Sequence, residues 1–419
     1  MVTYAVFCTP GYGHVNPTLA LAQELVARGQ RVIYYLPEDF RPAVEATGAV
    51  FRLYESEAWK KQLSLLASTF TRRVDLDNRM GFLSRMATIA LESVREIPHL
   101  LEQMVADHTD CVLYDRMFVQ GIFTSQALDL PAIQLLPSFA VNEHVFQQLA
   151  GQNKDDGRSF QEQVTTVRER LAVLEEDLSR ECERYKLPHF SFQQLVGRVE
   201  NLNIVFLPRA FQPAGETFDE RYLFVGPSLP AQRHYSGNFP LERLDKRPLL
   251  YISLGTAFNN QVDFYQMCFG AFAQSWWQVV LSFGTRIDAA ALGEPPANFL
   301  IAPHVPQLEV LSRADLFISH GGMNSIMESL WFGVPLVVVP QMMEQEMNAR
   351  RVQELGLGLM LEKEILTPEK LRAAVEQISH DSGFHTRVQQ MQQEMRQSGG
   401  YRRAVDEIIR YLGLPQLRP

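Results

Sequence analysis

Cysteines are few in this sequence, and they lie far apart. Cys8, Cys111, Cys182 and Cys268 form neither a CxxC pair nor a cluster with histidine. That scatter argues against a zinc site and against a disulfide framework, and it is typical of proteins whose thiols stay reduced. We therefore predict a cytoplasmic location.

Long apolar runs are also lacking. Nowhere does the chain hold about twenty uninterrupted apolar residues, the length that a membrane-spanning helix needs. Residues 1–7 are largely apolar but have no basic leader, and Pro10 and Gly11 interrupt them before the core of a signal peptide is complete. This stretch predicts a first strand, and we expect no stable membrane insertion.

An excess of basic residues is missing as well. The 39 Lys and Arg against 48 Asp and Glu give a formal net charge of −9, which disfavours a general affinity for nucleic acid or anionic membranes. The contents of 46% hydrophobic and 21% charged residues are those of a globular protein. At 419 residues the chain exceeds what one core usually serves, so two domains of roughly 200 residues are expected.

Short apolar runs alternate with longer helical patterns through the whole chain. This alternation predicts an α/β protein with two Rossmann-like, doubly wound parallel sheets. The expected strands are 3–8, 31–36, 111–114, 132–136, 203–207, 249–253, 278–283, 299–302, 316–319 and 336–339. Residues 158–185 carry apolar residues at helical spacing and predict a long amphipathic helix that packs on the core or lines a ligand pocket.

A stretch rich in proline and glycine at 226–248 predicts an interdomain linker. It separates an N-terminal domain, 1–225, from a C-terminal domain, 249–400. Residues 401–419 predict a further helix, for which packing back on the N-terminal domain is one option. Because α/β sheets bind ligands at the carboxyl ends of their strands, we expect the two domains to face each other across a binding cleft.

A strand, a glycine turn and a helix follow one another at 316–328. Gly321 and Gly322 allow close approach of the backbone to an anion, and the unpaired amides of a helix starting near Asn324 or Ser325 would face it. Glu328 lies one turn further on, where its carboxylate could accept hydrogen bonds from ribose hydroxyls. The alternative is a tight turn followed by an ordinary helix cap.

Two neighbouring loops strengthen the nucleotide interpretation, since HVPQ at 304–307 and PQMMEQ at 340–345 also follow strands. Together with HGGMNSIMES at 320–329, these motifs resemble the donor-binding signature of UDP-glycosyltransferases with the GT-B fold, of the bacterial macrolide and flavonoid type. The resemblance extends over residues 10–358. It implies contacts of a UDP-sugar donor with Ser253, Gly255, Thr256, His304, Val305, Gln307, His320, Gly322, Asn324, Ser325, Glu328, Glu344 and Gln345. His304 stands where the family often has Trp, which weakens stacking on the base or replaces it with an imidazole face.

A second strand, turn and helix follow one another near the N-terminus. Asn16 suits a helix N-cap, Pro17 the first helical position and Gly29 the C-terminal stop, so His14 is expected on the turn. The pattern Gly11-x-Gly13 lacks the third glycine of a dinucleotide fingerprint, which argues against NAD. Without further context, a histidine in a turn is by default an exposed or hydrogen-bonding residue.

GxGHxNP is similar to the catalytic-histidine loop of the same family. An imidazole near neutral pKa can remove the proton of an acceptor hydroxyl as the hydroxyl attacks. Asp115 ends a predicted strand and is our candidate to orient His14, although an Asp there could instead cap the next helix. By resemblance, the reaction inverts the anomeric configuration, needs no metal or other cofactor, and relies on His320 and helix amides to stabilise departing UDP.

The acceptor and the partners are less constrained. Apolar candidates for the acceptor pocket are Phe82, Met86, Phe118, Phe139, Phe146 and Leu187, although such residues are more often core. We expect a hexose donor, chiefly UDP-glucose, a small apolar hydroxyl-bearing acceptor such as a flavonoid, phenol, macrolide or terpenoid, and a monomer or weak dimer. The DxD at 75–77 is interpreted as surface charge. A UDP-sugar 2-epimerase and a non-catalytic UDP-sugar-binding protein are the alternative functions.

Overall fold

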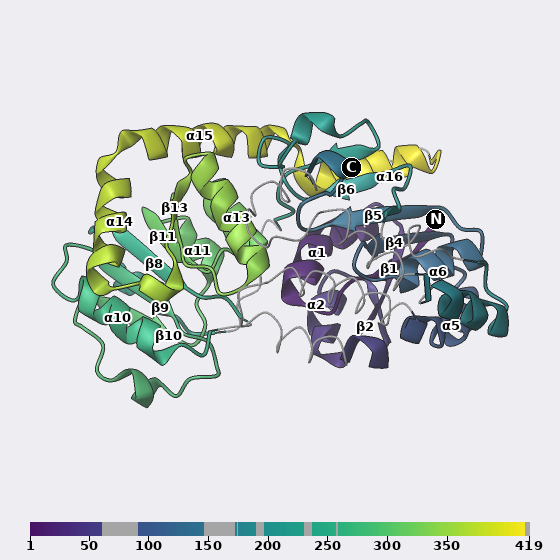
Figure 1. Ribbon diagram of the computed structural model, residues 1–419, viewed down its shortest axis with the longest axis horizontal. Coiled ribbons are helices and arrows are strands. Elements are labelled where there is room, and N and C mark those ends of the chain that lie inside the picture. Colours follow the sequence, from purple (N-terminus) through teal and green to yellow (C-terminus); the bar gives the residue numbers. More distant parts are fainter. Residues whose placement is uncertain are drawn as a thin grey trace. The chain divides into compact units, whose positions relative to one another are not determined.

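The chain forms two compact units in a computed structural model. The structure describes residues 1–60, 91–145, 172–173, 175–189, 197–229, 237–256 and 259–414. Unit 1 contains Met1–Ser228 and Gly399–Pro419, and unit 2 contains Leu229–Ser398. The first boundary between them therefore lies inside the stretch 226–248 (Figure 1).

Unit 1 contains a seven-stranded parallel sheet with the order β3-β2-β1-β4-β5-β6-β7. Its central strands are buried along their whole length, which explains their continuous apolar sequences. The strands are β1 (Thr3–Phe7), β2 (Arg31–Leu36), β3 (Val50–Leu53), β4 (Cys111–Asp115), β5 (Ala132–Leu136), β6 (Asn203–Val205) and β7 (Tyr222–Phe224).

Helices and two separate apolar clusters complete unit 1. The helices whose bounds are described are α1 (Tyr12–Ala27), η1 (Glu38–Phe40), α2 (Arg41–Glu45), α5 (Ile97–Ala106), α6 (Gln120–Ala127), η2 (Gly215–Thr217) and α16 (Gly400–Tyr411). Val6 and Tyr34 belong to one cluster, whereas Ala5 and Tyr35 belong to the other, because successive strand residues point to opposite faces of the sheet.

The C-terminal helix α16 packs against α1 of unit 1. Val405, Ile408 and Ile409 are at most 2% exposed and join the same apolar cluster as Leu21 and Leu25 of α1. Their spacing places them on one face of the helix. The last helix of the chain is therefore part of the N-terminal core.

Helix α1 starts earlier than the sequence predicted. Its N-cap is Gly11 and Pro17 lies inside it, so the predictions that Asn16 caps the helix and that Pro17 is its first residue are wrong. His14, predicted on the preceding turn, lies in the first turn of α1. The amides of His14 and Val15 both donate to the Gly11 carbonyl, at 2.9 Å each, and close the first turn before Pro17 is reached. The predicted stop is confirmed, because Gly29 follows the end of the helix with a φ of +74°.

Unit 2 contains a six-stranded parallel sheet with the order β10-β9-β8-β11-β12-β13. Its strands are β8 (Leu249–Ser253), β9 (Gln278–Ser282), β10 (Phe299–Ala302), β11 (Leu316–Ser319), β12 (Leu336–Val338) and β13 (Gly358–Met360). Helices α10 and α14 pack together (Figure 1). Helices α12 and α15 also pack together. The helices are η3 (Leu241–Arg243), α10 (Val262–Phe272), η4 (Ala289–Leu292), α11 (Gln307–Leu311), α12 (Met323–Trp331), α13 (Met343–Glu354), η5 (Lys363–Ile365), α14 (Pro368–His380) and α15 (Ser382–Gln397).

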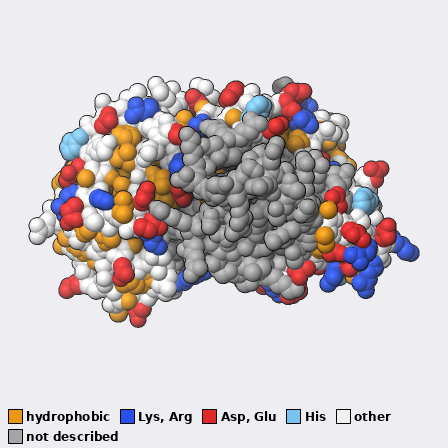
Figure 2. All heavy atoms as spheres, viewed as in Figure 1, with side chains coloured by type: hydrophobic (Ala, Val, Ile, Leu, Met, Phe, Trp, Pro, Cys, Tyr) orange, Lys and Arg blue, Asp and Glu red, His pale blue; other side chains and the backbone are white. Residues whose placement is uncertain are grey.

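The two parallel α/β sheets confirm the predicted fold class, and each of the ten expected strands is present. Of the predicted helix at 158–185, residues 172–173 and 175–184 are described and helical, and Leu178 and Cys182 lie in the core. All four cysteines are described and buried, and none of them forms a disulfide bond. Figure 2 shows acidic and basic side chains interspersed over the described part of one face. Among the described residues, no helix combines the length and apolarity needed to cross a bilayer.

Candidate functional site

His14 and Asp115 meet at the carboxyl edge of the unit 1 sheet. Strands β1 and β4 are neighbours with Phe7 opposite Tyr114, so the turn after β1 lies beside the end of β4. His14 Nδ1 forms a hydrogen bond with Asp115 Oδ2. The His14 side chain is 31% exposed and that of Asp115 only 3%, so the imidazole is accessible while its partner is enclosed.

The local turn holds the Asp115 carboxylate in place. Its Oδ1 accepts a hydrogen bond from the Met117 amide at 2.9 Å, which leaves Oδ2 to His14. Helix α6 begins only at Gln120, with Val119 as its N-cap, so Asp115 does not cap that helix. The alternative role considered for this residue is therefore not what the structure shows.

Electrostatics favour an ionised carboxylate at this position. Burial raises the pKa of Asp115, but the charge and hydrogen bond of His14, with hydrogen bonds from Met117 and Thr9, outweigh burial and lower the pKa below its usual value. An ionised Asp115 accepts the Nδ1 proton of His14, which leaves Nε2 as the ring nitrogen that can take up a proton.

The strand ends of unit 2 align at one edge of its sheet. Ser253 pairs with both Ser282 and Ser319, Ser282 pairs with Ala302, and Ser319 pairs with Val338. The candidate donor-binding residues lie at the end of β8, in the loops that follow β8, β10 and β11, and at the starts of α11, α12 and α13, so they gather at the same edge of the sheet.

Two glycines enclose the His320 imidazole. A Cβ added to Gly255 would lie 2.5 Å from His320 Cε1, and one added to Gly322 would lie 2.5 Å from His320 Nε2. Burial lowers the pKa of His320 to about 4, although a hydrogen bond with the Ser253 backbone acts in the opposite direction. The ring is therefore neutral at physiological pH and can donate a hydrogen bond without adding a charge.

The glycine turn directs the start of α12 toward the same edge. Gly321 has a φ of +86°, and its carbonyl accepts a hydrogen bond from the Asn348 side chain at 2.9 Å. The N-cap of α12 is Gly322, so Asn324 and Ser325 lie in the first turn and do not cap the helix, as the alternative required. The amides of this first turn can bind an oxyanion, because they lack partners within the helix.

Glu328 is buried inside unit 2, at 2% exposure. Its Oε2 accepts a hydrogen bond from Gln307 Nε2 at 2.5 Å, and Gln307 Oε1 accepts one from the Tyr251 hydroxyl at 2.9 Å. The loop at 304–307 and helix α12 are thereby linked. Sequence analysis missed Tyr251, because a tyrosine in a buried strand gives no sign of where its hydroxyl points.

The remaining donor candidates differ in exposure. His304, Thr256 and Glu344 are exposed, whereas Val305 is 9% and Gln345 5% exposed. Gln345 Oε1 accepts a hydrogen bond from the Gln341 amide at 2.8 Å and so fastens the loop before α13. Its side-chain NH₂ group still offers donors.

The predicted acceptor pocket is only partly described. Phe82, Met86, Phe146 and the DxD at 75–77 lie outside the described residues. Phe118 is 2% exposed and packs among aromatic core residues, with centroids 5.6 Å from Trp59 and 6.3 Å from Phe7. Leu187 joins the same core cluster, so core packing accounts for both residues.

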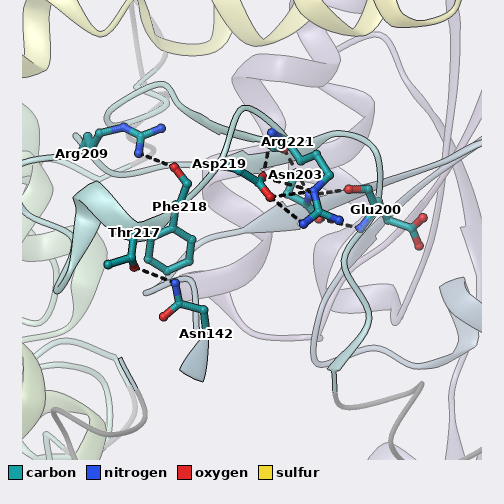
Figure 3. Close-up of polar contacts among 8 residues, drawn as sticks. All are labelled: Asn142, Glu200, Asn203, Arg209, Thr217, Phe218, Asp219 and Arg221. Atoms are coloured by element: carbon teal, nitrogen blue, oxygen red, sulfur yellow. Dashed lines mark hydrogen bonds and ion pairs between the residues drawn. The ribbon is translucent and has the colours of Figure 1, made fainter. Parts of the chain in front are cut away.

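The loops that follow β5 and β6 are joined by contacts that the sequence did not indicate. Phe139, half-buried, stacks on Phe211 at 5.8 Å, and Asn142 Nδ2 donates to Thr217 Oγ1 at 2.8 Å (Figure 3). Arg209 holds the second loop closed through the Phe218 carbonyl, at 3.0 Å (Figure 3). Phe139 is therefore the described acceptor candidate with a partly exposed ring on a fixed loop.

Comparisons with known proteins agree with this arrangement. The family model of erythromycin biosynthesis protein CIII-like C-terminal domains matches residues 271–409. The NDP-glycosyltransferase YjiC of Bacillus subtilis (strain 168) is 42% identical over 403 residues, which cover 96% of this chain and 95% of that protein. Demethyllactenocin mycarosyltransferase of Streptomyces fradiae is 32% identical over 414 residues, which cover 97% and 86%.

A solved structure extends the likeness to the whole fold. The crystal structure of the calicheamicin glycosyltransferase CalG4 has a TM-score of 0.81 and 32% sequence identity, and the match covers 100% of both chains. Sequence identity over nearly the full length and the shared pair of parallel sheets lead to one assignment. The chain is an enzyme of the UDP-glycosyltransferase family with the GT-B fold, of the bacterial macrolide and flavonoid glycosyltransferase type.

Proposed function

We propose that the enzyme transfers a hexose, chiefly glucose, from a UDP-sugar to a hydroxyl of a small apolar acceptor, with inversion at the anomeric carbon. The observation that carries the proposal is the hydrogen bond between His14 Nδ1 and the buried Asp115 carboxylate, which presents an accessible imidazole at a strand end. The uncharacterized UDP-glucosyltransferase YojK of Bacillus subtilis (strain 168) is 31% identical over 401 residues, and its name supports the choice of donor.

His14 acts as the general base in this proposal. Its Nε2 takes the acceptor hydroxyl proton while the oxygen attacks the anomeric carbon, and the bond between that carbon and UDP breaks with the electron pair leaving on UDP. Such base assistance typically contributes roughly 10²- to 10⁴-fold to the rate. Asp115 stabilises the imidazolium that forms and fixes the ring. A single displacement turns an α-linked donor into a β-glycoside.

Unit 2 holds the donor in this proposal. The amides at the start of α12 and the neutral ring of His320 bind the diphosphate and stabilise the charge that develops on departing UDP. Glu328 binds the ribose. Glu344 and Gln345 bind hydroxyls of the transferred sugar. His304, Val305 and Gln307 lie next to the uracil ring. No metal ion takes part. Catalysis requires that the sugar of this donor reach His14 of unit 1.

The acceptor side rests on unit 1. Phe139, partly exposed on its fixed loop, is the described residue that best suits contact with an apolar acceptor. A flavonoid, phenol, macrolide or terpenoid would satisfy this chemistry. The buried cysteines, which form no disulfide bond, fit a reducing cytoplasm, and we propose a monomer or weak dimer as the working state.

The test is a product assay. The protein is incubated with UDP-glucose, UDP-galactose, UDP-N-acetylglucosamine or dTDP-glucose against a panel of phenols and macrolides, and products are identified by mass and by anomeric coupling constant. We expect an acceptor-dependent β-glucoside from UDP-glucose. Conversion of the sugar without an acceptor would indicate an epimerase, and no acceptor-dependent release of UDP would indicate a binding protein.

A further inference from the structure

Two buried polar side chains and a half-buried glutamine between them form a chain across unit 2. The Tyr251 hydroxyl donates to Gln307 Oε1 at 2.9 Å, and Gln307 Nε2 donates to Glu328 Oε2 at 2.5 Å. These residues come from β8, α11 and α12, so the chain links three elements. Tyr251 and Glu328 are 1% and 2% exposed, whereas Gln307 between them is half-buried, so the two ends of the chain are shielded from water.

The orientation of the Gln307 amide follows from its two neighbours. A carboxylate oxygen accepts hydrogen bonds, so the NH₂ group of Gln307 must face Glu328 and its carbonyl must face Tyr251. Burial raises the pKa of the Tyr251 hydroxyl and outweighs a hydrogen bond with the Ser253 side chain, which lowers it; the charge of Glu328 raises it further, so this hydroxyl keeps its proton and can donate it. Tyr251 therefore holds the amide in one of its two orientations.

The aromatic ring of Tyr251 is fixed independently of its hydroxyl. It stacks on Phe317 of the neighbouring strand, with ring centroids 4.5 Å apart and planes at 13°. Removing the hydroxyl alone would preserve this packing. The packing role and the hydrogen-bonding role of the residue can thus be separated by experiment.

We propose that Tyr251 is a positioning residue for ribose recognition. Through Gln307 it fixes the Glu328 carboxylate in the orientation that accepts the two ribose hydroxyls of the donor. A carboxylate offers about four acceptor positions, so the bond from Gln307 does not by itself exclude bonds from ribose hydroxyls. This inference rests on the proposed role of Glu328 in binding the ribose of UDP.

Tyr251→Phe tests the inference without requiring turnover. Affinities for UDP and for 2′,3′-dideoxy-UDP are measured by calorimetry on the full chain. Wild-type protein should prefer UDP, and Tyr251→Phe should weaken UDP binding by roughly tenfold while leaving dideoxy-UDP binding within about twofold, because only UDP uses the positioned carboxylate. The variant should therefore lose most of the preference for ribose hydroxyls.

Tyr265→Phe is the matched control. Tyr265 is fully buried in the same unit, and its hydroxyl has no hydrogen-bond partner in the described structure. Its removal should leave both affinities unchanged. If Tyr251→Phe caused a general loss of folding, the affinities for UDP and for dideoxy-UDP would fall equally. That result would overturn the positioning role.

The outcomes separate this inference from the function on which it rests. A wild-type preference for UDP that Tyr251→Phe leaves intact would overturn the role of Tyr251 alone. Wild-type protein that binds both nucleotides equally, with Glu328→Gln unchanged toward both, would overturn the ribose assignment itself. A second variant, Gln307→Leu, should lower the preference as Tyr251→Phe does, and the double variant should add nothing further.

Discussion

Gly255 lies against the ring of His320, so close that a Cβ on Gly255 would be 2.5 Å from His320 Cε1. Gly255→Ala should therefore displace the imidazole and weaken UDP binding by at least about tenfold, as expected for the loss of a hydrogen bond to a charged group. The backbone there has a φ of +73°, which adds strain of roughly 1–2 kcal/mol. Calorimetry with UDP measures the effect.

Gly293→Ala provides a matched control for that substitution. Gly293 has a φ of +78°, but a Cβ there meets nothing within 4 Å. It should show the backbone strain in thermal unfolding while binding UDP as the wild type does. Equal affinities of the two variants would contradict a role for the His320 ring in holding the nucleotide.

The stability of the protein should depend on pH through His320. The folded pKa is about 4 against 6.5 for an unperturbed histidine, so between these values the unfolded state binds a proton that the folded state does not. Stability therefore falls as pH drops from 6.5 to 4, by on the order of 3 kcal/mol from this residue. Denaturant unfolding of wild type and His320→Gln across this range should show a smaller loss in the variant. If the free energy of unfolding depended on pH identically in wild type and variant, the lowered pKa of His320 would be refuted.

Helix α16, near the C-terminus, should stabilise unit 1, whose other elements come from the N-terminal part of the sequence. Ile408 is fully buried in the cluster that includes α1, so Ile408→Ala should lower the free energy of unfolding by about 2–5 kcal/mol. Ile365, 55% exposed, gives a control whose change to Ala should cost less than about 0.5 kcal/mol. Urea unfolding measures both, and similar values would contradict the packing of α16.

Activity should persist in excess EDTA. The proposed charge stabilisation on departing UDP comes from the amides of α12 and from His320, so no metal ion is needed. Replacing both aspartates of the DxD, Asp75→Asn and Asp77→Asn, should leave initial rates within about twofold, as is usual for solvated surface charges. Loss of activity that magnesium restores would overturn the metal-free mechanism.

The core strands of both sheets could be predicted from sequence because burial on both faces leaves a continuous apolar run. Strands β3, β7 and β13 were missed, and each lies at the edge of its sheet. β3 carries Arg52, which is bonded to Asp107, and β13 begins at Gly358, where a Cβ would lie 2.0 Å from the Leu336 carbonyl oxygen. Such residues obscure the apolar pattern of a strand, because an ion pair or a close backbone approach, and not burial in the core, determines which residue type fits there.

The candidate site shows the same division. His14 and Asp115 could be paired in advance, because parallel topology brings the ends of neighbouring strands together. The prediction that Asn16 caps the helix was wrong because the first turn closes on the Gly11 carbonyl. These are backbone hydrogen bonds, and no side-chain signal in the sequence indicates them. The hydroxyl of Tyr251 was unpredictable for a similar reason, as its partner depends on a loop 56 residues away in the chain.

The most direct measurement concerns His14→Ala. His14 belongs to unit 1 and the candidate donor-binding residues to unit 2, so the variant should bind UDP with an affinity within about twofold of wild type. At saturating UDP-glucose and acceptor its kcat should fall by roughly 10²- to 10⁴-fold, because general-base assistance is lost. A variant that turns over at the wild-type rate would contradict the account of this enzyme's mechanism.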